Sequence, residues 1–149
     1  MDVSVAVLEV FGFDPVLTEV KPLGEGLINY TYSLHSENDV YVLQKINTAV
    51  FKNPDAIAHN IKWVSDYLKV YHPDYYFVSP IHSVQGNQME YIDEGYYRVF
   101  PYVNGSHAKT VVQNEGQAFE AGYQFGHFTS VLNGINAVIY KSPFPIFII

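Results

Sequence analysis

Gly24-Glu25-Gly26-Leu27-Ile28-Asn29-Tyr30-Thr31-Tyr32 is the stretch that decides the fold, and Tyr41-Val42-Leu43-Gln44-Lys45-Ile46-Asn47 follows it after a short polar break. Each stretch alternates apolar and polar side chains, a pattern that predicts strands with one buried face. Glycines in a turn between strands let backbone N–H groups approach an anionic ligand closely. The first stretch therefore predicts a turn and a strand that together can hold an anion.

The composition limits the classes of protein that this chain can represent. Its 149 residues fit one domain, and an apolar fraction of 48% is ample for a packed core. The 13 tyrosines and 10 phenylalanines favour strands. With 8 basic against 15 acidic residues, the net charge is −7 and no basic stripe is visible, so we expect no nucleic-acid partner.

The absence of cysteine excludes disulfides, thiolate catalysis and cysteine–zinc sites. A reducing cytoplasm fits that absence, and no segment has the length of a membrane span or the form of a signal peptide. We therefore expect a cytoplasmic protein that does not contact a membrane.

Alternation and turn residues predict a β-rich first half. We expect strands over Leu17–Leu23, Ile28–His35 and Val40–Ile46, with the polar residues 36–39 forming a hairpin turn between the second and third. Before them, Ser4–Phe11 predicts a short helix that stops at Gly12.

A longer helix has clear signals at both ends. Asn53 suits the cap, Pro54 the first helical position and Asp55 the positive end of the helix dipole, while Pro73 closes the helix. Apolar residues recur at helical spacing, and we expect this stripe to pack on the preceding sheet. The stripe consists of Ile57, Ile61, Val64, Leu68 and Tyr71.

The second half predicts more strands and then a helix. We expect strands near Phe77–Ser83, Gln88–Ile92 and Tyr96–Val103, with turns at Gly86-Asn87 and Glu94-Gly95. Pro101 indicates a strand end or a sheet edge. From about Asn114 the helical spacing returns, carried by Ala118, Ala121, Phe125, Phe128 and Leu132.

The order of these elements resembles the N-terminal lobe of a protein kinase with its hinge. More specifically, the sequence resembles the aminoglycoside phosphotransferase and choline kinase superfamily, and within it the N-acetylhexosamine 1-kinases. The likeness covers about Leu17 to Leu132. It is carried by Gly24–Tyr32, Leu43–Asn47, Val50–Phe51, Asn60–Ile61, Gly95–Val99 and Phe119–Phe128.

The resemblance implies an α+β fold: a kinase-like N-lobe with an antiparallel sheet of about five strands plus one helix, then a hinge and the first helix of a truncated C-lobe. Residues 1–103 would form the N-lobe, and residues 104–149 the linker and the start of the C-lobe. It also implies that complete enzymes use ATP with Mg²⁺ to phosphorylate a small hydroxyl substrate, here an amino sugar.

The chemistry of such enzymes needs a catalytic Asp and metal-binding Asn and Asp residues further along the chain. No His-x-Asp or Asp-x-x-x-x-Asn pattern follows residue 105, and no Asp follows Asp93. We therefore expect an ATP-binding fragment that is inactive alone.

The resemblance assigns a candidate nucleotide site, and each part also has a plainer interpretation. The glycine turn could be an ordinary hairpin, and Asn29 could bond a phosphate or stiffen the turn. Tyr102 and Val103 would form the hinge, although any edge strand has free backbone groups. The candidate nucleotide-binding residues are Gly24, Glu25, Gly26, Leu27, Ile28, Asn29, Thr31, Val42, Gln44, Asn60, Tyr102 and Val103.

Gln44 takes the strand position where many kinases place the phosphate-binding lysine, and the resemblance makes Asn60 its partner on the helix. Alternation puts Val42, Gln44 and Ile46 on one face and Lys45 on the other. A half-exposed Gln44 and a solvent-facing Asn60 are the plainer interpretations. We expect Arg98 to pair with an acidic neighbour: Glu90, Asp93 or Glu94.

A second hypothesis makes the chain an interaction or carbohydrate-binding module that uses tyrosines of its sheet. Core packing is the commoner fate of such residues. The six histidines show no metal-ligand spacing, and no Gly-x-Ser-x-Gly motif supports a hydrolase. We also expect the helix near 114–132 to expose an apolar face through which copies of the chain associate. The tyrosines are Tyr30, Tyr32, Tyr75, Tyr76, Tyr96 and Tyr97.

Overall fold

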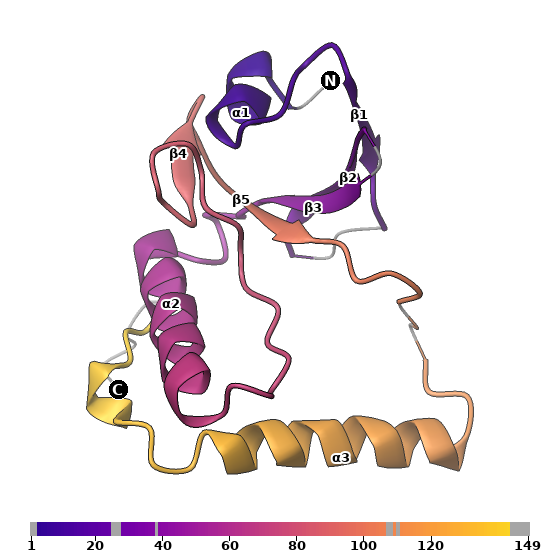
Figure 1. Ribbon diagram of the computed structural model, residues 1–149, viewed down its shortest axis with the longest axis vertical. Coiled ribbons are helices and arrows are strands. Elements are labelled where there is room, and N and C mark those ends of the chain that lie inside the picture. Colours follow the sequence, from indigo (N-terminus) through magenta and orange to yellow (C-terminus); the bar gives the residue numbers. More distant parts are fainter. Residues whose placement is uncertain (1–2, 25–27, 38, 107–108, 110, 144–149) are drawn as a thin grey trace.

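The computed structural model describes residues 3–24, 28–37, 39–106, 109 and 111–143 (Figure 1). Three helices and five strands follow the order that the sequence predicts, apart from one expected strand that is absent from the described chain. The elements are α1 (Val5–Val10), β1 (Thr18–Pro22), β2 (Tyr30–Ser36), β3 (Asp39–Lys45), α2 (Pro54–Tyr71), β4 (Glu90–Ile92), β5 (Gly95–Pro101), α3 (Glu115–Val131) and a 3-10 turn at Ala137–Ile139.

All five strands form one antiparallel sheet in the order β1-β2-β3-β5-β4. Tyr32, Leu43 and Val99 lie side by side across its three central strands. The predicted α+β class and the sheet of about five strands are confirmed.

Local turn chemistry explains the two hairpins. Ser36 and Asp39 pair across the β2–β3 turn, where Glu37 has a φ of +52°. In the β4–β5 turn, Asp93 and Glu94 both have positive φ, as a tight hairpin of right-handed twist requires. This turn lies one residue earlier than expected, and Gly95 already belongs to β5.

The main core lies between α1 and the sheet, on one side of the strands (Figure 1). Val7 of α1 and Leu34, Leu43 and Val99 of the sheet have no exposed surface. No α2 residue belongs to this cluster, so the expectation that the α2 stripe packs on the sheet is wrong in its main point. The short N-terminal helix covers the apolar face instead.

The predicted start of α2 is confirmed, because the Asn53 side chain accepts from the Ala56 N–H and Pro54 opens the helix. Only part of its apolar stripe is buried: Leu68 is buried, whereas Tyr71 is 66% exposed. A segment after α3 runs along α2 and bonds to it, as when the Tyr67 hydroxyl donates to the Asn133 carbonyl at 3.2 Å (Figure 1). The sequence predicted no element beyond Gly134.

The strand expected at Phe77–Ser83 is absent, because the segment pairs with no strand in a continuous ladder. Pro80 has no N–H to donate, so pairing is limited to isolated bonds such as Ile81 N–H to the Val99 carbonyl at 2.8 Å. Pro101 ends β5, as predicted.

α3 begins where predicted, with the Asn114 side chain capping the Gln117 N–H. The helix lies across the side of the molecule away from α1 (Figure 1). Ala118, Ala121 and Phe125 of the predicted apolar face are exposed, Phe125 by 74%, so the expected exposure of this face is confirmed. No described helix has both the length and the apolar character that crossing a membrane requires.

Candidate functional site

The sheet face opposite α1 carries the candidate site, and we call it the open face. Strand alternation sends every second side chain to this side. The residues that define it are all half-buried: Thr31 from β2, Val42 and Gln44 from β3, and Arg98 and Phe100 from β5.

Thr31, Gln44 and Arg98 form a row across the three central strands, because each is paired with the next in the sheet register. Arg98 donates to Gln44 Oε1 from Nε at 3.1 Å and from Nη2 at 2.9 Å. Arginine has no acceptor, so the oxygen of the Gln44 amide must face it and the NH₂ group must point elsewhere. The predicted face for Gln44 is confirmed.

The prediction that Arg98 pairs with an acidic neighbour is wrong. Glu90 accepts instead from Ser83 and Asn87, and Asp93 from Ser4. Glu90 pairs with Tyr97 in the register, so its side chain leaves the sheet on the side opposite to that of Arg98.

The surroundings of Arg98 are poor in compensating charge. Among the described residues it forms no ion pair, and its Nη1 is buried without a hydrogen-bond partner. The guanidinium carbon lies 5.0 Å from the centre of the Phe100 ring. Desolvation lowers the pKa of Arg98 from its ordinary value to about 10.

The glycine turn joins β1 to β2 at one end of this face. Gly24 has a φ of +71°, a conformation that favours glycine, and the N–H of Leu23, one residue past the end of β1, bonds to the carbonyl of Thr31 in β2. Ile28 is half exposed. Three predicted site residues, Glu25, Gly26 and Leu27, lie outside the described residues.

Asn29 ties this turn to the end of β3. Its side-chain oxygen accepts from the Asn47 N–H at 3.0 Å, which is the stiffening role that the sequence offered as one alternative. A contact between Asn29 and a phosphate stays a prediction.

The predicted pair between Gln44 and Asn60 does not form. The Asn60 side chain donates to the Lys141 carbonyl at 2.6 Å and accepts from the Lys141 N–H at 3.0 Å. The nitrogen and the oxygen of the Asn60 side chain therefore both bond to Lys141, in the segment that runs along α2. A role of Asn60 in nucleotide binding stays a prediction without this support.

The connector after β5 offers fewer groups than the sequence suggested. The Tyr102 N–H already bonds to the Val40 carbonyl at 3.2 Å, and the Val103 carbonyl accepts from Ser106 at 3.0 Å. The Tyr102 carbonyl and the Val103 N–H remain the candidates for contact with a base. A hollow of about 200 Å³ lies here, lined by Asp39, Val40, Tyr41, Pro101, Tyr102 and Asn104.

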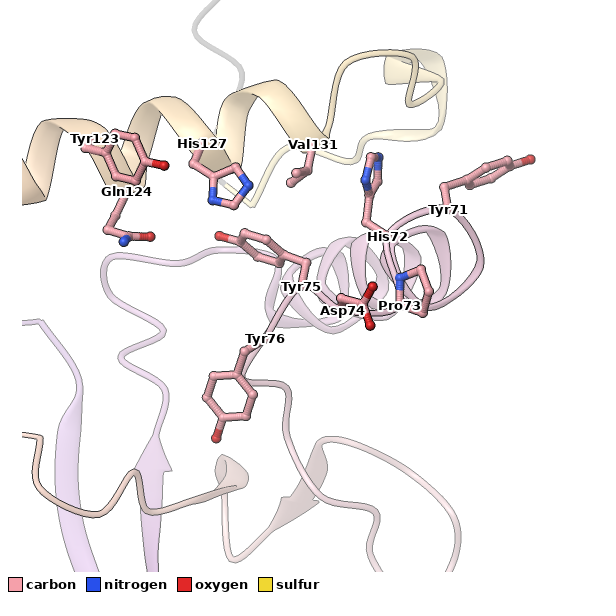
Figure 2. Close-up of a pocket in the computed structure, with 10 residues that line it drawn as sticks. All are labelled: Tyr71, His72, Pro73, Asp74, Tyr75, Tyr76, Tyr123, Gln124, His127 and Val131. Atoms are coloured by element: carbon pink, nitrogen blue, oxygen red, sulfur yellow. The ribbon is translucent and has the colours of Figure 1, made fainter.

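A second hollow, of about 700 Å³, lies between the end of α2 and α3 (Figure 2). Tyr75 points toward α3 and meets His127 edge to face at 5.3 Å, whereas Tyr76 points away from it. Tyr32 and Tyr97 are buried in the core on the far side of the sheet. The six tyrosines of the carbohydrate-binding hypothesis therefore do not form one surface.

The described residues hold no group of three or more His, Asp or Glu side chains that could bind a metal ion. The part of the chain described here therefore does not fit a Mg²⁺ site of its own. Oxygen ligands for a metal would have to come from the nucleotide or from residues elsewhere.

Sequence reasoning missed two members of the open face: Arg98, as the partner of Gln44, and Phe100. Arg98 and Phe100 are two residues apart on β5, so their side chains lie on the same side of the sheet. The pairing of β3 with β5 reveals that both belong to the open face, because it places Gln44 beside Arg98 and Val42 beside Phe100. That register is a tertiary property, which the alternation within one strand does not determine.

No protein-family model matches the sequence. Two solved structures of spectinomycin phosphotransferase APH(9)-Ia share its fold. The complex with ADP and spectinomycin has a TM-score of 0.56 and 15% identity, over 96% of this chain and 40% of that chain. The AMP-bound complex has a TM-score of 0.56 and 14% identity, over 93% of this chain and 37% of that one.

The chain thus spans about two fifths of the length of these phosphotransferases. Identity this low establishes a shared fold and nothing about activity. The fold is that of a kinase-like N-lobe, as the sequence predicted.

Proposed function

We propose that this chain is the nucleotide-binding lobe of a phosphotransferase that acts on a small molecule. One observation carries the proposal: a polar row of Thr31, Gln44 and Arg98 crosses the open face of a sheet whose fold is shared with a phosphotransferase crystallised with ADP. Polar groups on a half-buried face need partners, and a ligand supplies them.

The open face has a layout that suits an elongated nucleotide. Val40, beside the connector, and Gln44 are four residues apart on β3, a distance of about 13 Å in a strand. A base beside Tyr102 and Val103 would place the ribose near Val42 and the phosphates near Gln44 and the glycine turn. The apolar pair of Val42 and Phe100 would then contact the base and sugar.

The residues of this chain bind and orient, and they do not provide phosphoryl transfer. Such chemistry needs a catalytic carboxylate and carboxylate or amide ligands for Mg²⁺. No Asp follows Asp93 in these 149 residues. We propose that the lobe is inactive alone, that the boundary with the next lobe lies near residues 103–104, and that the acceptor of the complete enzyme is an amino sugar, as the resemblance implies.

Calorimetric titration of the 149-residue chain with ADP and ATP tests this function. We expect measurable binding that Val42→Glu abolishes, because a carboxylate on the open face excludes the base and repels phosphates. Val70→Glu is the matched control, since Val70 is 70% exposed on α2 and the charge change is the same. A flat trace for the unmodified chain with both nucleotides would overturn the proposal.

A parallel titration with N-acetylglucosamine separates this function from the carbohydrate-binding alternative. Under the proposal, the sugar gives no heat in the absence of the second lobe. Sugar binding that survives Val42→Glu, together with no nucleotide binding, would favour the alternative.

We also propose that the exposed face of α3 mediates self-association. Ala118, Ala121 and Phe125 share one side of the helix and are all exposed, Phe125 by 74%. Light scattering should show oligomers that increase with concentration, and Phe125→Asp should reduce them. Val138→Asp is the control, because Val138 is 91% exposed but lies outside α3. A clean monomer at high concentration would contradict the proposal.

A further inference from the structure

The open face holds the single arginine of the chain, Arg98, in a place where its charge is uncompensated. The only described side chain that it bonds is the neutral Gln44, through Oε1. A cation that leaves water normally pairs with an anion, because desolvation without a partner costs several kcal/mol. Arg98 lacks that partner within the described residues.

The guanidinium also has unused donors. It carries N–H donors on Nε, Nη1 and Nη2 in a rigid fork, and two of these nitrogens face Gln44 Oε1. Nη1 is buried without a hydrogen-bond acceptor in the described chain. The side chain as a whole is only half-buried, so the open side of the sheet gives access to it.

The bonds to Gln44 have a second consequence. They fix the amide with its oxygen toward Arg98, so the Gln44 NH₂ group donates away from the arginine. A neutral glutamine at the position of the kinase lysine supplies no charge by itself. The arginine on the next strand supplies the charge, and the glutamine supplies additional donors.

We propose that Arg98 binds the phosphate groups of the nucleotide in place of a strand lysine, and that it orients Gln44 so that the amide donates to the same phosphates. This inference rests on the proposed function and names the residues that recognise the phosphates. The fork of arginine matches the oxygens of a phosphate, and its charge is more effective in a poorly solvated site.

A bound water is the plainer explanation of the buried Nη1. Water satisfies the hydrogen bond but leaves the positive charge without a counter-ion. The other buried polar atom without a partner in the described residues is Gln88 Oε1, an uncharged acceptor for which water is sufficient. The two cases differ in charge, and the experiment is designed to detect charge.

The test compares ADP, adenosine and tripolyphosphate as ligands of the unmodified chain, Arg98→Met and Arg98→Lys. We expect Arg98→Met to weaken ADP binding about tenfold to a hundredfold, the effect of losing hydrogen bonds to a charged group. Adenosine affinity should not change, and tripolyphosphate binding should be lost. Arg98→Lys should lie between, since it keeps the charge and loses the fork.

If Arg98 had only a structural role, Arg98→Met would weaken the binding of ADP and of adenosine equally. An unchanged ratio of the two affinities therefore overturns the inference. If Arg98→Met does not fold, the same ratio measured for Arg98→Lys decides. If the unmodified chain binds ADP and the Arg98 variants bind it equally well, the inference about Arg98 fails while the proposed function stands. If the unmodified chain binds neither ADP nor adenosine, the proposed function itself has failed.

Discussion

The two faces of this sheet are built from the same strands but differ in composition and burial. Against α1, Leu34, Leu43 and Val99 have no exposed surface and no polar atoms in their side chains. On the open face, their strand neighbours include Thr31, Gln44 and Arg98, which are half-buried and polar. Strand alternation makes both patterns from one continuous sequence.

The difference separates what stabilises the lobe from what it recognises. Burial of apolar side chains on the α1 face supplies the free energy of folding. The open face keeps a cation and an amide where apolar residues would pack more favourably. A ligand explains that composition better than packing does.

The largest contrast should come from truncating neighbouring residues on opposite faces. Leu43→Ala leaves a cavity under α1 and should lower the free energy of unfolding by about 3 kcal/mol. Val42→Ala, one residue earlier on the open face, should cost less than about 1 kcal/mol because its side chain is only half-buried. Urea unfolding measures both. Equal losses would show that the two faces are packed alike.

Gly95 tests how tightly the α1 face is packed at the edge of β5. An added Cβ would lie 2.7 Å from the Tyr97 ring and 2.8 Å from Lys45 Cε, and Tyr97 is only 2% exposed. Gly95→Ala should therefore cost about 1–3 kcal/mol.

Gly122→Ala in α3 is the control for Gly95→Ala, because its φ is unstrained and, among the described residues, no atom beyond its chain neighbours and its own helix backbone lies within 4 Å of the added Cβ. It should stabilise the chain by about 0.5–1 kcal/mol through helix propensity. Thermal unfolding of the two alanine variants gives the comparison. A neutral Gly95→Ala would mean that Tyr97 and Lys45 can both shift.

The elements that the sequence predicted well are those that depend on neighbouring residues. The Asn53 cap, the stop at Pro101 and the strand alternation each need only a few adjacent positions. The kinase-like order of the elements followed from those local signals.

The errors concern contacts between distant parts of the chain. Asn60 bonds a residue 81 positions away, and Arg98 bonds one 54 positions away. Neither partner has a local signature, so the family resemblance suggested Gln44 for Asn60, and acidic residues nearby in the sequence were expected for Arg98. The same holds for the apolar face of the sheet, which α1 covers and α2 does not.

Arg98→Met should change the stability of the ligand-free chain by less than about 1 kcal/mol. The loss of its bonds to Gln44 is offset by relief from burying an unpaired cation. Urea unfolding without nucleotide measures this, with Gln44→Leu/Arg98→Met as the variant that leaves no polar group unpaired. A loss of several kcal/mol in both variants would make Arg98 a structural residue.

Lys45→Met should have the smallest effect and is the sharpest test of register. The Lys45 ammonium lies 5.5 Å from the centre of the Tyr97 ring on the α1 face, a contact worth about 0.5 kcal/mol. Because a shift of one residue exchanges the faces of a strand, Lys45 would be the phosphate ligand if β3 paired one residue out of register. We therefore expect Lys45→Met to leave ADP affinity unchanged while Arg98→Met lowers it. The opposite result in a calorimetric titration would assign the phosphates to the lysine and reverse the roles of the two faces.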